Sequence, residues 1–173
     1  VHATDWKIDP DPRVGRPTDE DALRALGDEG VLALICDSTN VFVEGEAGSE
    51  AALRESLIEI IRKCTGRVAV ASFASNVARV ATINKAAVET GRNPSMVGRS
   101  LWRSVDISRE CGYLDDIEPF VTESEIRFIP PDKVLMAVTG SQGEPRSALS
   151  RIADGSHQSV SLEAGDTVIF SSR

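Results

Sequence analysis

The chain has 173 residues, a length that suits one domain with a continuous core. Its hydrophobic content of 41% and charged content of 27% are those of an ordinary globular protein, and no apolar run approaches the ~18 residues that cross a bilayer. The net charge of −8 argues against broad, charge-driven binding to nucleic acid. With two histidines, the chain cannot build a multi-histidine metal site by itself.

Strand-like and helix-like stretches alternate along the chain. After a proline-rich loop at residues 9–20, a short helix is expected to start near Thr18, and Val31–Cys36 has the continuous apolar pattern of a strand covered on both faces. The later stretches are a helix capped by Ser49, a strand at 68–72, a helix at 76–89, a short strand within 94–100, a helix at 101–110, a strand at 134–138, a helix opened by Pro145, and strand patterns within 154–172. This alternation predicts an α/β fold of three layers, with a mainly parallel, Rossmann-like sheet and helices on both faces.

Three apolar runs stop at small polar residues where a helix can begin: VLALICDSTN, VAVASFASN and VLMAVTGSQGEP. In a parallel sheet with helix crossovers, the carboxyl ends of the strands lie on one side, and ligands bind outside those ends. We therefore expect one cleft to be faced by Asp37, Ser75, Asn76, Ser141 and Gln142.

Two of these turns carry candidate functional groups, and each has a plainer explanation. Asp37 sits at a rigid strand end where an acid or ligand would be useful, but Asp also favours turns and caps for local hydrogen bonding. Ser75-Asn76-Val77 opens a helix whose free N–H groups make a phosphate seat, and ordinary N-capping accounts for the same residues. The TGSQGEP turn has the same potential for anions, although it is neither a Walker A loop nor a GxGxxG fingerprint.

Other reactive or aromatic residues are expected to be structural. His157 lies in a polar turn and is predicted to be exposed or to cap that turn, while Trp6 and Trp102 are predicted to pack rather than to stack on bases. The cysteines fall in apolar patterns, which suits buried thiols in a reducing compartment. They are Cys36, Cys64 and Cys111.

The motifs of the chain also stand in a recognisable order: HATDWKID, EGVLALICDSTN, FASN, VGRS, TGSQGEP followed by ALSRIADG, and GDTVIFSS. In this order, along nearly the whole length, they resemble the ribonuclease J family, the bacterial β-CASP branch of the metallo-β-lactamase fold. The resemblance implies that residues 1–18 are the trailing end of the metallo-β-lactamase domain and a linker, that 19–165 are the β-CASP domain, and that 166–173 are a return strand toward the catalytic domain.

The resemblance also implies roles for single residues. Asp5 resembles the family's aspartate that bridges two divalent ions, zinc or manganese, and Asp37 resembles the acid that orients a metal-binding histidine. Ser75, Asn76 and Val77 resemble part of the pocket that holds the phosphate of RNA. In such an enzyme the paired metals activate a water and stabilise the in-line displacement at phosphorus.

The chain departs from the family pattern in two respects. The usual His-Thr-Gly-Asp appears as His2-Ala3-Thr4-Asp5, and the HxHxDH motif and the further histidine motifs are absent. We expect the chain to be a piece of a longer protein, and expect this piece alone to hold no metal firmly and to be inactive.

The expected function is that of a metal-dependent ribonuclease in the cytoplasm, acting on RNA with a 5′ monophosphate end and also internally. Its expected partners are RNA, its own metallo-β-lactamase domain and further copies of itself, with no membrane. Arg79, Arg99 and Arg103 could line a path for RNA, with solvated helix faces as the plainer alternative. Two other functions stay open: a non-catalytic, Rossmann-like module that binds a nucleotide or phosphate, and a β-CASP hydrolase with another substrate.

Overall fold

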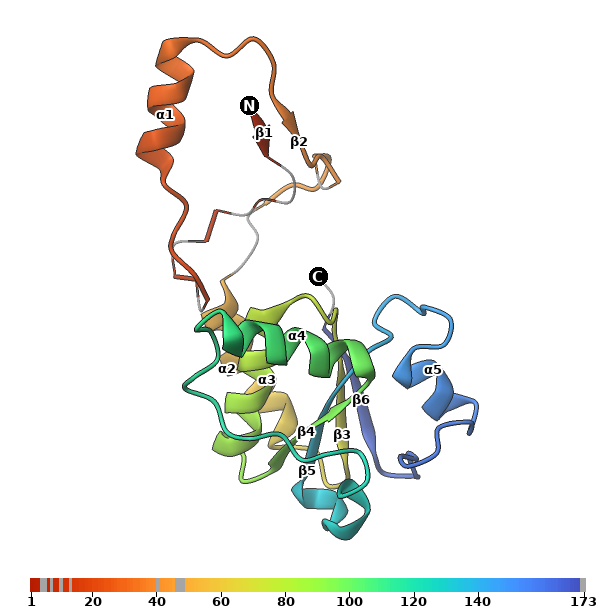
Figure 1. Ribbon diagram of the computed structural model, residues 1–173. Helices are drawn as coiled ribbons and strands as arrows, with labels where there is room; N and C mark the ends of the chain where they lie inside the picture. The colour runs from red at the N-terminus through yellow and green to blue at the C-terminus, as the bar shows by residue number, and fades with distance from the viewer. Residues whose placement is uncertain are drawn as a thin grey trace. The chain divides into compact units, whose positions relative to one another are not determined.

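The computed structural model describes residues 1–3, 6, 8–9, 11–12, 14–39, 41–45 and 49–171. The chain divides into two compact units, Val1–Leu53 and Arg54–Arg173 (Figure 1). This division does not test the domain boundaries expected from the sequence, which stay predictions.

The described residues of the first unit include helix α1 (Glu20–Glu29), a two-stranded sheet and the first residues of the helix that follows them. Helix α1 begins at Asp19, whose carboxylate accepts the N–H of Ala22 at 2.9 Å, and it ends at Gly30 with a φ of 92°. Strand β1 (His2–Ala3) pairs in parallel with β2 (Ile35–Cys36). The N-cap is thus Asp19, one residue after the Thr18 that the sequence suggested.

The prediction that Val31–Cys36 forms a strand covered on both faces is wrong for the described structure. Only its last two residues form a strand, and Leu32 and Leu34 are 105% and 62% exposed. An apolar strand is buried where other elements cover its faces, and α1 buries none of its residues. For the same reason, Cys36 and Trp6 are exposed here, although both were predicted to be buried or packed.

The second unit is built on a four-stranded parallel sheet. Its strands are β3 (Val68–Ala71), β4 (Asn93–Val97), β5 (Val134–Val138) and β6 (Thr167–Phe170). Their order across the sheet is β4-β5-β3-β6, and each neighbouring pair is parallel. The predicted α/β fold with a parallel sheet is confirmed.

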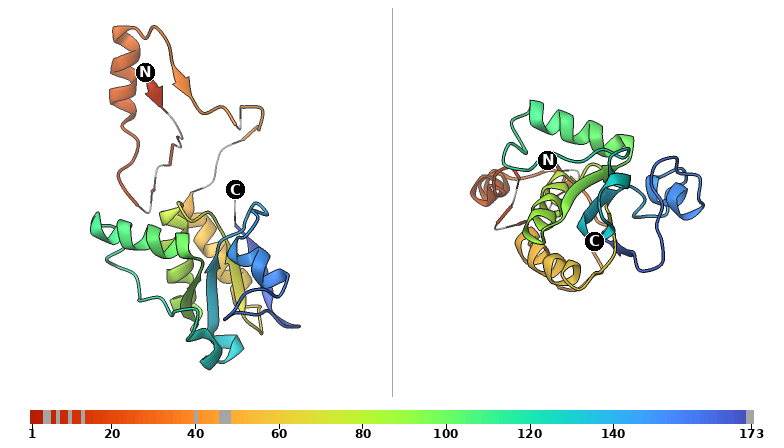
Figure 2. Two further views of the ribbon diagram at one scale, coloured as in Figure 1. Left: turned by 45° about the vertical axis from the view of Figure 1, so that its right-hand side comes forward. Right: turned by 90° about the horizontal axis from the view of Figure 1, so that it is seen from below.

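Helices cover both faces of this sheet, as Figure 2 shows. One face packs against α2 (Glu50–Ile61), α3 (Val77–Glu89) and α4 (Arg99–Glu110). The other packs against α5 (Ala148–Ala153) and the short 3₁₀ turn Ile126–Phe128, which is followed by a second such turn at Pro131–Lys133. The result is the three-layer arrangement expected from the sequence.

The core follows the alternation of side chains along the strands. In β3, Val68 and Val70 pack under α2 and α3, whereas Ala69 and Ala71 face the α5 side. All residues of β3 and β5 are fully buried, which explains why both strands read as continuous apolar runs. Trp102 packs against the α2 and α3 side in an edge-on contact with Phe120, with ring centroids 6.4 Å apart, as predicted for a packing residue.

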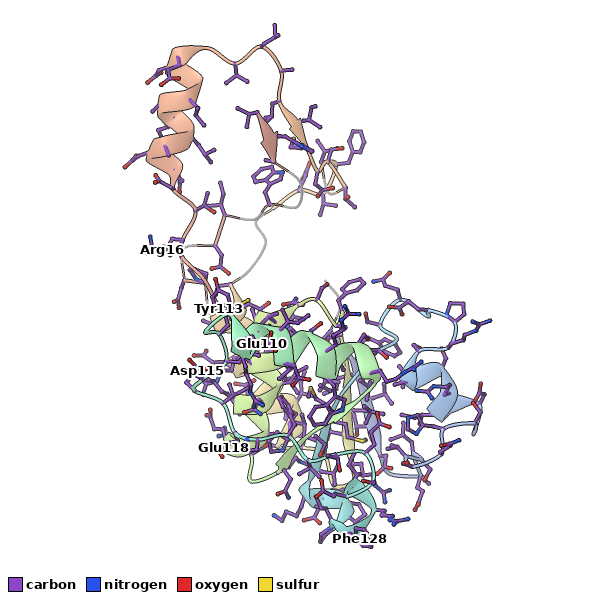
Figure 3. All side chains as sticks on the ribbon, in the orientation of Figure 1. Arg16, Glu110, Tyr113, Asp115, Glu118 and Phe128 are labelled. Atoms are coloured by element: carbon purple, nitrogen blue, oxygen red, sulfur yellow. The ribbon has the colours of Figure 1, made fainter. Side chains whose placement is uncertain are left out.

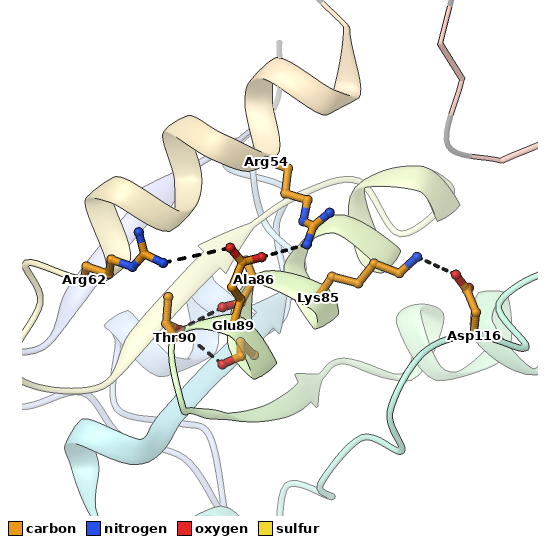
Figure 4. Close-up of polar contacts among 8 residues, drawn as sticks. Arg54, Arg62, Lys85, Ala86, Glu89, Thr90 and Asp116 are labelled. Carbon is orange, nitrogen blue, oxygen red and sulfur yellow. Dashed lines mark hydrogen bonds and ion pairs between the residues drawn. The ribbon is translucent and has the colours of Figure 1, made fainter.

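Ion pairs on the surface join α2 to α3 (Figure 4). The carboxylate of Glu89 on α3 accepts a hydrogen bond from Arg54 at 2.7 Å and lies 3.9 Å from Arg62, both on or next to α2. Thr90 ends α3 by donating its hydroxyl to the carbonyl of Ala86 at 2.8 Å. Exposed ion pairs contribute little to stability, so the buried core that α2 and α3 share is what holds these helices together.

Three further expectations need correction. The last helix starts at Ala148 rather than at Pro145, because the hydroxyl of Ser147 caps it by accepting the N–H of Ser150 at 3.2 Å. Residues 156–162 form loops, so the strand patterns after residue 154 produce one strand, β6. Cys111 is exposed at the end of α4, and Cys64 is half-buried against the core.

Among the helices of the described residues, none has both the length and the apolar character needed to span a bilayer.

Candidate functional site

The carboxyl ends of the strands in the second unit form one aligned edge. Ala71 of β3 lies opposite Val138 of β5 and Phe170 of β6, and Val138 lies opposite Val97 of β4. The residues that follow these strand ends therefore emerge side by side, as expected for a parallel sheet.

A cleft of about 570 Å³ opens at this edge, a volume within the range of small-ligand sites. We call it the strand-end cleft. It is lined by Ser72, Ala74, Gly98, Arg99, Ser100, Thr139, Glu144, Pro145, Arg146, Ser147, Ala148 and Arg151.

The backbone around the strand-end cleft is closely packed at two glycines. Gly98 has a φ of 126°, and a Cβ there would lie 3.0 Å from the hydroxyl of Thr139. Gly140 has a φ of 120°, and its Cβ would lie 2.5 Å from the Oγ of Ser147. Thr139 also accepts the N–H of Ala148 through its hydroxyl at 3.0 Å, so the turn after β5 is fixed to the start of α5.

The charged side chains of the cleft are three arginines and one glutamate. The carboxylate of Glu144 accepts the N–H of Gln142 at 2.9 Å. Within the described part of the chain, Arg99, Arg146 and Arg151 form no ion pair with an acidic side chain. The cleft is thus locally cationic in a chain whose net charge is −8.

The cleft also contains donors without acceptors. The hydroxyl of Ser72, a residue 1% exposed, has no hydrogen-bond partner among the described residues. Helix α4 has no side-chain cap at Gly98, whose own N–H is donated to Glu123 at 2.8 Å. Buried hydroxyls and helix N-termini without partners are unfavourable unless a ligand or water satisfies them.

The turn after β3 holds the residues predicted to bind phosphate. Ser75 is exposed, and Asn76 caps α3 by accepting the N–H of Arg79 with its side-chain oxygen at 3.0 Å. The capping role that the sequence offered as the plainer explanation is therefore present. Val77 is the first residue of α3. Ala74 lines the strand-end cleft, so the turn begins there, although Ser75–Val77 are not among its lining residues.

Ser141 and Gln142 follow β5 at the same edge of the sheet but likewise do not line the cleft. Ser141 is buried with its hydroxyl unpartnered among the described residues, and Gln142 is exposed. The structure thus brings the turns after β3 and β5 together as expected, while different residues of those turns form the cleft.

Asp37 belongs to the other unit, Val1–Leu53, and its place in a shared cleft stays a prediction. Its carboxylate accepts hydrogen bonds from the hydroxyl of Thr39 and then from the N–H of Thr39, which lower the pKa of Asp37. The backbone carbonyl of Asp37 accepts the indole N–H of Trp6 at 3.2 Å. These contacts match the turn explanation. Asp5 lies outside the described residues.

His157 caps its turn, and it is buried rather than exposed. Its side chain is 3% exposed, and Nδ1 accepts the N–H groups of Ser159 and Val160 at 3.3 and 3.2 Å. Nε2 lies 3.6 Å from a carboxylate oxygen of Glu123. Burial lowers the pKa of His157, the nearby charge of Glu123 raises it, and that of Arg151 lowers it further.

Metal ligands do not gather in the described structure. Across its described ranges, no group of three or more His, Cys, Asp or Glu side chains is arranged to hold a metal ion. The side chains described here therefore do not by themselves fit a dinuclear metal centre, and we derive no step through a metal from them.

Sequence reasoning missed three members of the cleft: Ser72, Arg146 and Arg151. Arg146 directly follows the TGSQGEP turn, which did indicate the right place. Of the arginines considered for an RNA path, Arg99 lines the cleft, whereas Arg79 is buried and donates to the carbonyl of Ser171 at 2.8 Å. Arg103 is exposed on α4 and does not line it.

Comparison with known proteins assigns the family. The model of the ribonuclease J β-CASP domain matches residues 65–173, more than half of the chain, including all four strands of the parallel sheet and the whole strand-end cleft. The chain belongs to the ribonuclease J β-CASP domain family. The resemblance read from the sequence motifs is confirmed.

Curated relatives named ribonuclease J match along the full chain. The chain is 48% identical to ribonuclease J of Sinorhizobium meliloti over 173 residues, which are 100% of this chain and 31% of that protein. It is 46% identical to ribonuclease J of Mycolicibacterium smegmatis, with 99% of this chain and 31% of the relative covered, and 39% identical to that of Thermus thermophilus, with 99% and 30% covered. The chain thus spans about a third of the length of these ribonuclease J proteins.

Proposed function

We propose that this chain is the β-CASP domain of a metal-dependent ribonuclease that hydrolyses phosphodiester bonds in RNA as a 5′ exonuclease, an endonuclease or both. In this proposal the domain closes over the active-site cleft of its own metallo-β-lactamase domain and supplies contacts to the phosphates of RNA. The full protein carries two divalent ions, zinc or manganese, works in the cytoplasm and assembles with further copies of itself. When bound, the ions supply an activated water and stabilise charge at phosphorus.

The observation that carries the proposal is the turn from β3 into α3, in a chain of the ribonuclease J family. Ser75 is exposed there and Asn76 caps the helix, so the positive end of the α3 dipole lies in the turn that follows β3. Helix N-termini of this kind attract phosphate without adding formal charge. This reconciles a role on RNA with the acidic net charge of −8.

The contribution of this chain is binding and positioning. Ser75 and Asn76 offer short polar side chains to the 5′ monophosphate of RNA, at the positive end of the α3 dipole. Asp37, if it orients a metal-binding histidine of the full protein, acts through its second carboxylate oxygen, because Oδ1 already accepts from Thr39. Asp5 is proposed as a metal ligand.

The test uses the full-length protein that contains this chain. Asp caps a helix as well as Asn does, so Asn76→Asp keeps the cap of α3 and adds a negative charge where the phosphate would bind. We expect this variant and Ser75→Ala to lose preference for 5′-monophosphate over 5′-hydroxyl RNA, with the larger loss, about tenfold, for Asn76→Asp.

Asn93→Asp is the matched control, because it makes the same charge change at the amino end of β4, where Asn93 donates to the carbonyl of Lys133 at 3.0 Å. Unchanged preference in Asn76→Asp would contradict the phosphate role of this turn. Absence of any RNA hydrolysis by the wild-type protein with manganese or zinc would overturn the proposed function itself.

A further inference from the structure

We propose that the strand-end cleft is a second phosphate site, which holds a phosphodiester of the RNA strand between Arg99, Arg146, Arg151 and the hydroxyl of Ser72. This inference rests on the proposed function, because it takes RNA as the ligand. It adds a site next to Ser75–Val77, one that binds a phosphodiester following the 5′ monophosphate of the RNA chain.

The strand-end cleft has more positive than negative lining side chains. Three arginines line the same cleft, and none forms an ion pair with an acidic side chain in the described parts of the chain, although Arg151 interacts electrostatically with Asp154. The one acidic lining residue, Glu144, has its carboxylate directed to the N–H of Gln142. Arginine binds phosphate through its planar fork of donors. This group of arginines therefore suits a phosphate better than an apolar ligand.

Two buried donors beside the cleft also lack acceptors among the described residues. Ser72 is 1% exposed, lines the cleft, and its hydroxyl meets no acceptor among the residues that the structure describes. The Nε of Arg151 is likewise buried and unpartnered there. Leaving such groups unpaired is unfavourable, which favours a ligand with acceptor oxygens in the cleft.

Helix α4 also offers backbone donors to the cleft, next to the N–H of Gly98, which already donates to the carboxylate of Glu123 at 2.8 Å. This helix of 12 residues has Gly98 as its N-cap, with no side-chain cap, and the N–H groups of Arg99 and Ser100 have no acceptor among the described residues. Both residues line the cleft. The helix dipole therefore adds to the attraction that the arginine side chains exert on an anion.

The position of the cleft suits a phosphate that belongs to an RNA strand rather than to a small free ligand. Ala74 lines the strand-end cleft, and the next residue, Ser75, opens the turn proposed to hold the 5′ monophosphate. Two phosphate sites that adjoin along one turn fit successive phosphates of a single strand. Arg146 is held at the cleft with a φ of 65°, an unusual conformation for a residue other than glycine.

The experiment measures binding of fluorescent 5′-monophosphate oligoribonucleotides to the full-length protein, with a chelator present to prevent hydrolysis and over a series of salt concentrations. We expect Arg99→Gln and Arg146→Gln each to weaken binding about tenfold. The slope of log affinity against log salt should fall by about 0.7 for each lost phosphate contact. Arg109→Gln is the control, because Arg109 is an exposed arginine at the far end of the same helix.

A second variant separates binding from folding. Ser72→Ala removes a buried hydroxyl that has no partner, so the melting temperature should stay the same or rise while RNA affinity falls severalfold. A lower melting temperature with unchanged RNA affinity would mean that Ser72 is structural and would overturn its place in the site.

A mononucleotide arm distinguishes the source of the phosphate. Uridine 5′-monophosphate should bind the cleft variants as it binds the wild type, because it occupies the Ser75–Val77 site. If the variants lose mononucleotide binding and keep RNA binding, the cleft is a site for a small phosphorylated ligand and the inference is wrong. If wild-type protein binds and cleaves RNA but all cleft variants equal it, the inference fails and the proposed function stands.

Discussion

Asn84 on α3 holds the backbone of Glu118 through a pair of hydrogen bonds. Its side-chain NH₂ donates to the Glu118 carbonyl at 2.9 Å, and its side-chain oxygen accepts the Glu118 N–H at 3.1 Å. Asn84 is fully buried, and Glu118 belongs to the acidic connection after α4, where Figure 3 labels Asp115 and Glu118. The amide of Asn84 therefore helps to fix this connection to the core.

We predict that Asn84→Asp destabilises the chain by about 3 kcal/mol, because it removes the donor to Glu118 and buries a charge. Urea unfolding measures the change. Asn93→Asp is the control, since Asn93 is exposed and its single bond to Lys133 should contribute about 0.5 kcal/mol. Equal effects of the two substitutions would contradict the anchoring role of Asn84.

Arg92 joins loops at the amino ends of the strands. It is 7% exposed, and its guanidinium donates to the carbonyls of Cys64 at 2.6 Å, Gly66 at 2.7 Å and Val134 at 3.1 Å. A lysine cannot reproduce this fork, so Arg92→Lys should lower the free energy of unfolding by about 2–4 kcal/mol.

The matched control for Arg92 is Arg62→Lys, at a side chain that is 59% exposed and 3.9 Å from Glu89. Its unfolding free energy should change by less than about 0.5 kcal/mol. Thermal and urea unfolding both report the difference, and a small loss in Arg92→Lys would show that water can replace these three bonds.

Gly140 and Gly143 test the turn after β5. Both have positive φ, 120° and 73°, but a Cβ at Gly140 would lie 2.5 Å from Ser147 Oγ, whereas one at Gly143 would meet open space. We expect Gly143→Ala to lower the unfolding free energy by about 1 kcal/mol and Gly140→Ala by about 3 kcal/mol. A similar loss in both would mean that Ser147 and α5 move aside freely.

Stability should depend on pH through His157. Burial depresses its pKa in the folded chain, so the unfolded chain binds a proton more readily once the pH falls below the ordinary value of about 6.5. The stabilisation from the neutral imidazole is present above that pH and is lost toward the lower folded pKa. Unfolding at pH 7.5 and 5.5 should show a larger loss in the wild type than in His157→Gln. A reversed trend would contradict the depressed pKa.

The elements of the parallel sheet could be predicted because their causes are local. β3 and β5 are buried on both faces and so are apolar at every position, and α3 begins where Asn76 can cap it. The family resemblance then placed these motifs in order. Neither the local patterns nor the family resemblance requires knowledge of which sequence-distant residues are in contact.

The features that could not be predicted depend on contacts between sequence-distant residues. Val31–Cys36 has the same apolar pattern as β3, yet it is exposed, because burial depends on covering elements that the pattern does not encode. Ser72 and Arg151 are far apart in the sequence, and they share a cleft only after α5 packs beside β3 and β4. The polar residues most visible in the motifs, Ser75 and Asn76, directly follow the lining residue Ala74 but do not line the cleft.

The strand order has a consequence for how this unit is made. β3 is the first strand of its sheet to leave the ribosome, yet Val68 finds its partners at Leu135 and Thr167, much later in the chain. The apolar strand β3 therefore has no partner strand in its sheet until most of the unit has been synthesised. Pairing between sequence-distant strands of this kind slows folding. Nascent chains that end before residue 134 should therefore be the ones that chaperones capture.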